Sequence, residues 1–348
     1  MRKVKIKKPS VKAAAALIIC LLGAGFLISS AFTLNLQTGQ LGSGTYSGET
    51  LAHSLDLSLA SKATYPSSPL KIVKNLGVSG DIKEQVVSFA VTTDHLTEYA
   101  LMMLPAKTAP PQGFPAIILC HGYINPAQYK TTEGYISDMQ FYADHGFAVI
   151  KPDFRGQGMS AKQGIPASAY YSMAYNIDVM SLINSLKQTG GINKSRLNLW
   201  GHSMGAYIAL RASVISKDIK NTILLSVPGG SLKDIYLSYV PPSDENNIDA
   251  LKTRAEVFDE YGTPAKSTAF WRNASPVNFL WNSTSAYQIH LGLKDSIVPT
   301  SLATNLNSAL AAAGKTHQYY KYPNGEHGLQ PQRYLIWSRS LQLLEKSP

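Results

Sequence analysis

Residues 196–213 read RLNLWGHSMGAYIALRAS, an apolar strand-like run followed by a tight turn and a helical pattern. The turn is Gly201-His202-Ser203-Met204-Gly205, in which a glycine stands two residues before the serine and another two residues after it. A strand-to-helix turn of this kind strains the backbone of the serine, and larger flanking side chains would clash. The stretch therefore predicts a nucleophilic Ser203 between a strand and a helix, with Gly201 and Gly205 relieving the clash.

The rest of the chain from residue 82 alternates short apolar runs with longer helical patterns. Strands are expected at 86–91, 99–104, 116–120, 147–151, 197–200, 222–227, 288–291 and 318–322, and helices at 135–145, 176–189, 204–213, 300–313 and 332–346. Strands that alternate with helices pair in parallel through right-handed crossovers. We therefore expect an α/β fold, with a mostly parallel eight-stranded sheet covered by helices on both faces. Residues 231–285 show no clear strand and are predicted to form a small helical cap over the end of the sheet where ligands bind.

A nucleophilic serine needs a base, and the base needs an acceptor that orients it. Asp295 follows the first strand after the cap, and His327 follows the next strand. Because the carboxyl ends of parallel strands meet at one edge of a sheet, we expect both side chains to converge on Ser203. The rival candidates are a histidine at the start of a strand and two aspartates of the cap that are expected to be solvated: His317, Asp249 and Asp259.

Acyl transfer also passes through an oxyanion, which requires two backbone N–H donors. Met204 follows the nucleophile at a helix amino terminus and is expected to supply one. The loop after strand 116–120 contains Gly122 and Tyr123, and the N–H of Tyr123 is the expected second donor. Gly122 would let the backbone approach closely.

Six segments carry a family resemblance: CHGY, FAVIKPDFRGQGMS, LNLWGHSMGAYIAL, NASPVNF, LGLKDSIVP and YPNGEHGL, in this order from about residue 82 to the end. Through them the chain resembles the α/β-hydrolase superfamily, and most the catalytic domain of the prolyl oligopeptidase (S9) group and its dienelactone-hydrolase-like relatives. The resemblance implies a serine hydrolase with a Ser-His-Asp triad and an acyl-enzyme intermediate. Asp153 and Arg155 match one family segment and are expected to form a structural pair near the site.

The chain departs from that family in two places. Gly205-Ala206 stands where the peptidases usually have two glycines. Those peptidases also usually carry a β-propeller that screens substrates, whereas only a hairpin and a linker precede the hydrolase segments here. The substrate therefore stays open between a small-molecule ester, cleaved by a carboxylesterase, and a peptide. A catalytically silent binding module with this fold is the alternative from another class.

The formal net charge of +10 is concentrated at the amino terminus. Residues 1–12 hold six cations and no acid: Arg2, Lys3, Lys5, Lys7, Lys8 and Lys12. No stripe of Lys and Arg with interleaved aromatic residues follows, so no nucleic-acid partner is expected. The sequence also lacks metal-ligand spacing, a G-x-G-x-x-G motif and a phosphate loop, so neither a metal nor a cofactor is expected. The oligomeric state is left open.

An uncharged run of twenty residues, Ala13–Phe32, follows these cations. In a helix it would span about 30 Å, the thickness of the hydrocarbon core of a bilayer. Positive charge before the run orients the amino end toward the cytoplasm. Residues 1–32 are therefore predicted to be a membrane anchor or signal segment before an extracytoplasmic body, which would be secreted if cleavage occurs after Ala31. Residues 33–69, rich in Ser, Thr and Gly, are predicted to be a linker to a hydrolase domain at 70–348.

Overall fold

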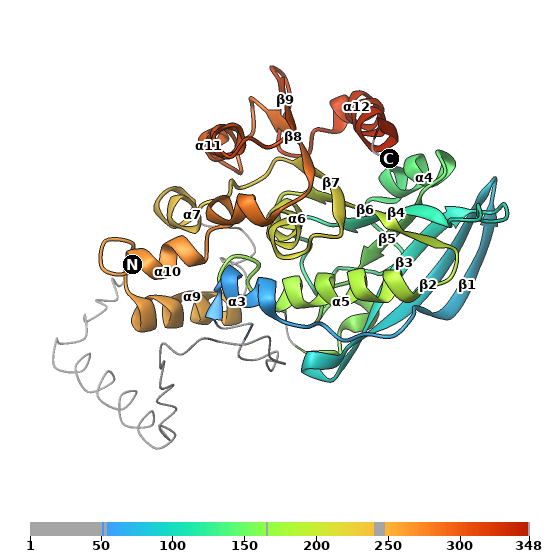
Figure 1. Ribbon diagram of the computed structural model, residues 1–348, viewed down its shortest axis with the longest axis horizontal. Helices are drawn as coiled ribbons and strands as arrows, with labels where there is room; N and C mark the ends of the chain where they lie inside the picture. Colours follow the sequence, from blue (N-terminus) through green and yellow to red (C-terminus); the bar gives the residue numbers. More distant parts are fainter. Residues whose placement is uncertain (1–50, 52–53, 165, 240–247, 347–348) are drawn as a thin grey trace, which may run out of the picture. The chain divides into compact units, whose positions relative to one another are not determined.

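A computed structural model describes residues 51, 54–164, 166–239 and 248–346. Its centre is a nine-stranded sheet with the order β1-β2-β3-β5-β4-β6-β7-β8-β9 (Figure 1). The strands are β1 Lys71–Ser79, β2 Ile82–Val91, β3 Leu96–Pro105, β4 Phe114–Cys120, β5 Ala148–Pro152, β6 Ile192–His202, β7 Ile219–Leu225, β8 Ala286–Gly292 and β9 His317–Tyr322. Strands β4 to β9 pair in parallel, whereas β1, β2 and β3 join them as an antiparallel extension.

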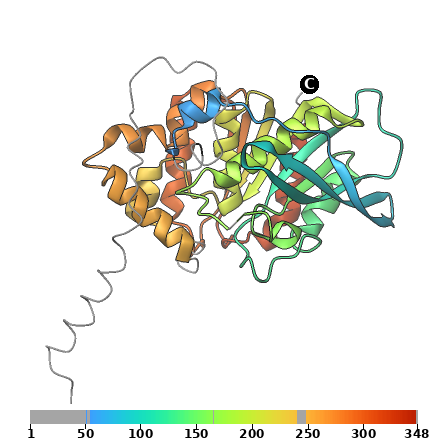
Figure 2. The same cartoon turned by 90° about the horizontal axis from the view of Figure 1, so that it is seen from below.

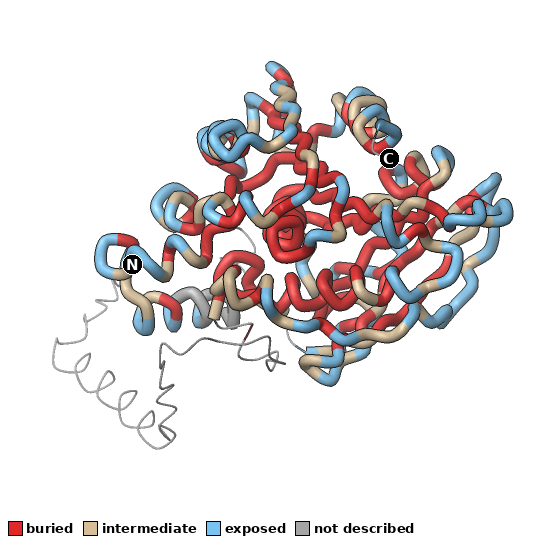
Figure 3. The backbone as a smooth tube through the Cα atoms, viewed as in Figure 1, coloured by how far each residue is buried: buried red, intermediate tan, exposed pale blue. Residues whose placement is uncertain are grey.

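Helices cover both faces of this sheet, as predicted (Figure 1). Alternate residues of β4 separate the two cores: Ile117 and Leu119 pack with α4 and α12, while Ile118 and Cys120 pack with α5 and α6. Every residue of α6 is buried, which Figure 3 shows as a helix that is red throughout. The helices named here are α4 Ile136–Asp144, α5 Ala174–Gln188, α6 Met204–Ile215 and α12 Arg333–Lys346.

The sheet has one strand more than the eight that the sequence predicts. The missed strand is β1, whose residues are almost all exposed. It lies at the edge of the sheet and pairs with β2 alone. Its apolar residues Ile72 and Val78 are therefore 56% and 62% exposed. An edge strand without a buried face leaves no alternation of polar and apolar residues for sequence reasoning to detect.

The expected linker, 33–69, differs from the structure in its second part. From Leu51 onward the chain packs on the hydrolase domain: Leu51, Leu55 and Leu57 are buried, and α3 Leu57–Lys62 contacts α6. The following segment runs along α5 (Figures 1 and 2), where Asn184 donates a 2.8 Å hydrogen bond to the carbonyl of Tyr65. The apolar residues here are few, but Leu51, Leu55, Leu57, Ala60 and Tyr65 are buried. Residues 33–50 lie outside the described part.

Between β7 and β8 the chain forms the predicted cap segment. It contains α7 Leu232–Ser238, α9 Ile248–Tyr261, α10 Thr268–Asn273 and η3 Pro276–Asn282, which lie together in Figures 1 and 2. Aromatic side chains join these helices. Phe258 of α9 stacks on Trp271 of α10 at 5.6 Å between ring centroids, and Tyr236 of α7 contacts both rings. The remaining helices are α11 Thr300–Ala312 and the short η1 Thr92–Asp94, η2 Gly158–Ser160 and η4 Gln330–Gln332.

None of the helices in the described residues has the length and apolar character needed to cross a bilayer. The segment expected to do so, residues 1–32, lies outside the described part of the chain.

Candidate active site

Ser203 stands in the turn between β6 and α6, and its backbone is left-handed with φ 54° and ψ −120°. The two flanking glycines are fixed by close backbone contacts. A Cβ on Gly201 would lie 2.4 Å from the carbonyl oxygen of Gly205, and a Cβ on Gly205 would lie 2.0 Å from that of Cys120. Both distances are far below contact, so the turn and its packing on β4 require glycine at both positions.

The three side chains singled out in the sequence lie within hydrogen-bond distance of one another. Nε2 of His327 is 2.9 Å from Oγ of Ser203, and Nδ1 of His327 is 2.9 Å from Oδ2 of Asp295. The second oxygen of Asp295 accepts the N–H groups of Ile297 and Val298, both at 2.9 Å. Burial opposes ionisation, but these hydrogen bonds prevail and hold the pKa of Asp295 below its ordinary value. The carboxyl group is therefore an anion at neutral pH.

The loops that carry Asp295 and His327 are joined through their backbones. The N–H of Lys294 donates to the carbonyl of Gly325 at 2.8 Å. A Cβ on Gly292 would come within 2.4 Å of the same carbonyl oxygen. Because β8 and β9 are parallel neighbours, both loops leave the sheet at the same edge as the turn of Ser203. This arrangement sets the distance between the side chains of Asp295 and His327.

On the other side of Ser203 lies the loop after β4. The ring of His121 is fully buried, and its Nδ1 lies 2.7 Å from the carbonyl oxygen of Gly122. Burial lowers the pKa of His121 to about 4, so the neutral ring donates its single N–H to this carbonyl. That carbonyl belongs to the peptide unit whose N–H is that of Tyr123. In a trans peptide the two groups point in opposite directions, so His121 fixes the direction of the Tyr123 N–H.

A cavity of about 200 Å³ opens at Ser203. It is lined by the expected oxyanion donors, by His327 and by several aromatic residues: Gly122, Tyr123, Tyr135, Tyr170, His202, Ser203, Met204, Tyr239, Ile297 and His327. Arg211 of α6 holds the segment of Tyr170 in place, since it donates to the carbonyls of Ala169, Tyr170 and Ser172 at 2.7–3.0 Å. Arg211 therefore connects this part of the cavity wall to α6, the helix that follows Ser203.

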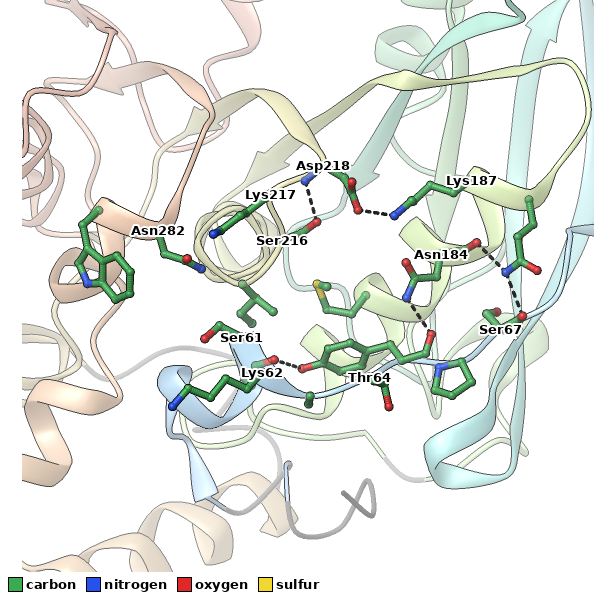
Figure 4. A pocket seen from close by; sticks show the side chains of 18 residues that line it. Ser61, Lys62, Thr64, Ser67, Asn184, Lys187, Ser216, Lys217, Asp218 and Asn282 are labelled. Atoms are coloured by element: carbon green, nitrogen blue, oxygen red, sulfur yellow. Dashed lines mark hydrogen bonds and ion pairs between the residues drawn. The ribbon is translucent and has the colours of Figure 1, made fainter. Parts of the chain in front are cut away.

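A larger hollow, of about 870 Å³, lies elsewhere (Figure 4). It separates residues 60–67 from the ends of α5 and α6, and Lys62, Lys217 and the Lys187–Asp218 ion pair surround it. None of the expected catalytic residues is among those that line it. Its size alone does not make it the catalytic site.

The rival residues lie away from Ser203. His317 begins β9, at the opposite end of that strand from His327, and its Nδ1 contacts the carbonyl of Lys315 at 2.8 Å. Asp259 is exposed on α9, and Asp249 lies on the same helix.

The expected pair of Asp153 and Arg155 is wrong, although both residues are structural. Asp153 instead accepts hydrogen bonds from Tyr129 and Thr131, at 3.1 and 2.7 Å. Arg155 pairs with Asp178 and Asp94. These partners lie on segments far from residues 153–155 in the chain, so local spacing could not identify them.

Sequence reasoning did not identify five residues of the cavity. Tyr135, Tyr170, Tyr239 and Ile297 come from separate segments, and no local pattern marks them. His202 is the fifth. It does not bond the serine, but it lines the cavity, and its ring centroid is 5.1 Å from that of His327. Its position beside the nucleophile was the only sequence signal for any of the five.

Several solved structures resemble this chain in fold. The chain is 16% identical to an acetyl xylan esterase from Paenibacillus sp. R4, with a TM-score of 0.63 over 88% of this chain and 96% of that one. It is also 16% identical to dipeptidyl peptidase 4 from Porphyromonas gingivalis, with a TM-score of 0.57 over 82% of this chain and 36% of that one. At these identities the likeness shows the α/β-hydrolase fold.

Sequence comparison finds two curated relatives. The chain is 28% identical over 155 residues to a non-heme chloroperoxidase from Streptomyces lividans, which covers 44% of this chain and 46% of that protein. It is 21% identical over 276 residues to a probable dipeptidyl-aminopeptidase B from Emericella nidulans, covering 76% and 28% respectively. The chain thus spans less than half the length of both curated relatives. A model of the prolyl oligopeptidase family, peptidase S9, matches residues 134–345, most of the described part. The chain therefore belongs to the prolyl oligopeptidase family.

Proposed function

We propose that Ser203, His327 and Asp295 form the catalytic triad of this hydrolase. The observation that carries the proposal is the pair of 2.9 Å contacts that join the three side chains in the order hydroxyl, imidazole, carboxylate. Because Asp295 is an anion that can only accept, His327 carries its proton on Nδ1 and directs the lone pair of Nε2 at the serine hydroxyl. Ser203 can then transfer its proton to Nε2 as it attacks a carbonyl carbon.

The attack converts the carbonyl oxygen into an oxyanion, and the backbone N–H groups of Tyr123 and Met204 are the proposed donors. Two observations support this role. Both residues line the cavity with Ser203, and the direction of the Tyr123 N–H is fixed by His121. Met204 is the first residue of α6, where N–H groups lack helical partners and the helix dipole favours negative charge. Collapse of the intermediate leaves an acyl-serine, which a water molecule hydrolyses with His327 as base.

We further propose that the preferred substrates are esters of small uncharged acyl groups. Pockets for drug-sized ligands measure about 300–1,000 Å³, and the cavity at Ser203 is smaller, at about 200 Å³. Among the described residues that line it there is no aspartate or glutamate, so a free amino group of a peptide would find no carboxylate partner there. The tyrosine rings and Ile297 instead form an apolar wall with hydroxyl tips.

Peptide hydrolysis is the second candidate, and membership of the prolyl oligopeptidase family favours it. The structural match to an acetyl xylan esterase favours the first candidate. The acetyl xylan esterase is covered over 96% of its length, whereas dipeptidyl peptidase 4 is covered over 36%, so most of that peptidase has no counterpart in the match. Nearly the whole of that esterase therefore has a counterpart in this chain, which supports the esterase proposal.

One set of substrates separates the two activities. The purified protein is assayed with p-nitrophenyl acetate, butyrate and octanoate and with aminoacyl-naphthylamides, beside the variant Ser203→Ala. We expect kcat/KM to be highest for acetate, to fall with chain length and to vanish in the variant. A preference for the amides would contradict the esterase proposal. Activity that survives in Ser203→Ala would contradict the triad, and a folded protein that neither turns over substrate nor reacts with a fluorophosphonate would be a silent binding module.

We also propose that the body is extracytoplasmic and tethered by residues 1–32. The support is the run of twenty uncharged residues behind six cations. In cells that express the full chain, we expect the protein in the membrane fraction, released by detergent but not by high salt, with a body that external protease can reach. A full-length chain in the soluble fraction would contradict the tether, and loss of residues up to Ala31 from the mature protein would indicate secretion.

A further inference from the structure

A chain of hydrogen bonds runs from the loop of Tyr123 to the backbone of His327. The N–H of Gly122 donates to the hydroxyl of Tyr135 at 2.9 Å, and this hydroxyl lies 2.8 Å from Nδ1 of His202. Nε2 of His202 lies 3.0 Å from the carbonyl oxygen of His327. Two side chains therefore connect the expected oxyanion loop with the residue proposed as the base.

The proton positions along this chain follow from its two ends. The carbonyl of His327 can only accept, so Nε2 of His202 must carry a proton. Burial lowers the pKa of His202 to about 3, so the ring is neutral and Nδ1 is left as an acceptor. Burial also raises the pKa of Tyr135 to about 12, so its hydroxyl is protonated and donates to Nδ1. Each link then has one donor and one acceptor, from Gly122 through Tyr135 and His202 to His327.

Both ends of this chain of hydrogen bonds lie at backbone groups next to the proposed catalytic groups. Gly122 is bonded through both of its backbone groups: its N–H donates to the Tyr135 hydroxyl, and its carbonyl accepts from His121. The peptide unit that carries the Tyr123 N–H is therefore restrained on both sides. At the other end, the carbonyl of His327 also accepts a 2.7 Å hydrogen bond from Oγ of Ser226. The position of the His327 backbone sets where its ring meets Ser203.

The surrounding backbone is built around these two side chains. Tyr135 has a left-handed conformation, with φ 60° and ψ 15°, which is uncommon and costly for a bulky residue. A Cβ on Gly122 would lie 2.7 Å from the Tyr135 hydroxyl and 2.9 Å from Nδ1 of His202. The glycine thus makes room for the bonds, and the strain at Tyr135 places its hydroxyl between the two partners.

We propose that Tyr135 and His202 are positioning residues that hold the oxyanion loop and the catalytic histidine at a fixed separation. The inference rests on the proposed function of Ser203, His327 and Asp295. The two residues exchange no proton with substrate in this role. They act on the rate by keeping the Tyr123 N–H and the His327 ring in register, which a transition state needs more than the bound substrate does.

The test uses two variants that break the same bond. Tyr135→Phe removes the donated proton, and His202→Gln keeps a donor for the carbonyl of His327 but loses the ring nitrogen that accepts from Tyr135. We expect each to lower kcat for p-nitrophenyl acetate by roughly 10- to 100-fold, the size of effect that misplacement by about 1 Å produces, while KM changes by less than about threefold.

The double variant distinguishes a single connected chain from two separate roles. If the residues act through the bond that they share, Tyr135→Phe combined with His202→Gln should lose no more activity than the worse single variant. Losses that multiply in the double variant would overturn the inference, and so would single variants with kcat within twofold of wild type. Should Tyr135→Phe fail to fold, His202→Gln and His202→Asn, which each break one of the two bonds of His202, carry the same test.

A matched control removes another tyrosine hydroxyl. Tyr65 is buried and bonded to the carbonyl of Ala60 at 2.9 Å, but it borders the hollow of Figure 4 and not the cavity at Ser203. Tyr65→Phe should keep full kcat even if its melting temperature falls. A loss of activity in this control equal to that in Tyr135→Phe would show a general effect of instability and overturn the inference. A wild-type protein that a fluorophosphonate does not label would contradict the proposed function instead.

Discussion

The close contact between α6 and the end of β4 can be tested by adding a single methyl group to Gly205. In Gly205→Ala the new Cβ would lie 2.0 Å from the carbonyl oxygen of Cys120 and 2.5 Å from that of His121. Both are backbone atoms, so no side chain can rotate away. The start of α6, which carries Met204, must move away from the loop that carries Tyr123.

The size of the movement can be worked out from these distances. Ordinary contact begins at 3.4 Å, so the helix and the strand would have to separate by up to about 1.4 Å. Forcing an extra methyl group into a packed core typically costs about 1–3 kcal/mol, which lowers Tm by roughly 2–5 °C for a domain of this size. A misplacement of about 1 Å in an active site costs about 100-fold in rate, and here the two proposed oxyanion donors move apart.

The assay compares Gly205→Ala with Gly190→Ala. Gly190 is exposed, has no atom within 4 Å of the added Cβ and needs no left-handed backbone, so it reports the effect of a methyl group alone. We expect Gly190→Ala to match wild type, and Gly205→Ala to melt earlier and to lose about 100-fold in kcat for p-nitrophenyl acetate. A Gly205→Ala protein with wild-type Tm and kcat would refute the claim that this backbone approach fixes the oxyanion site.

Three other changes test separate parts of the structure. Asp295→Asn should lower kcat about 10⁴-fold with little change in KM, because the amide no longer selects the tautomer of His327 that accepts from Ser203; equal activity in a kinetic assay would contradict the triad. Arg211→Lys should raise KM for p-nitrophenyl acetate about tenfold, since a single ammonium nitrogen cannot occupy the positions of both guanidinium nitrogens that hold the three carbonyls beside Tyr170; an unchanged KM would show that Arg211 does not shape the cavity. Burial, with the charge of Asp178, raises the pKa of Glu98 from 4.5 to about 9. The folded state therefore keeps a proton that the unfolded state releases, and stability should fall as pH rises from about 4.5 to 9. Glu98→Gln should raise Tm at pH 8 and not at pH 4, unlike the exposed control Glu345→Gln, and an equal shift at both pH values would contradict this assignment.

The interior of the fold could be predicted from the sequence because nearly all residues of the central strands β4, β5, β7 and β8 are buried. All eight predicted strands are present, and the nucleophile turn follows the strand that was expected to carry it. The signal failed where burial is one-sided or absent. Strand β1 has no buried face, and Leu51, Leu55 and Leu57 pack on the domain as isolated apolar residues in a polar segment. Neither pattern repeats with the period of a helix or of a half-buried strand, so neither can be distinguished from a solvated loop.

The residues of the site likewise fall into those that the sequence predicted and those that it did not. Ser203, Asp295 and His327 each follow a strand of a parallel sheet, so the order of the strands was enough to bring them together. Tyr135 could not be found by that reasoning, because it lies at the start of α4 and reaches the site through an unusual backbone angle. Its hydroxyl bonds groups that lie 13 and 67 residues away in the chain. Contacts of this kind depend on how loops approach one another, which strand order does not specify.

The glycines near the site explain why its geometry depends on the backbone more than on side chains. A Cβ on Gly205 would strike β4, one on Gly292 would strike the loop of His327, and one on Gly122 would strike Tyr135 and His202. Each glycine therefore faces a different segment, and together they bring four loops closer than any side chain would permit. Ala206, which replaces the second glycine usual in the family, is fully buried, so the close approach that matters at this turn is made by Gly205. Once the loops are this close, hydrogen bonds such as those of Tyr135 and His202 can connect their backbones directly. The rate of the enzyme should then be most sensitive to substitutions that separate loops, even where these leave all three triad residues intact.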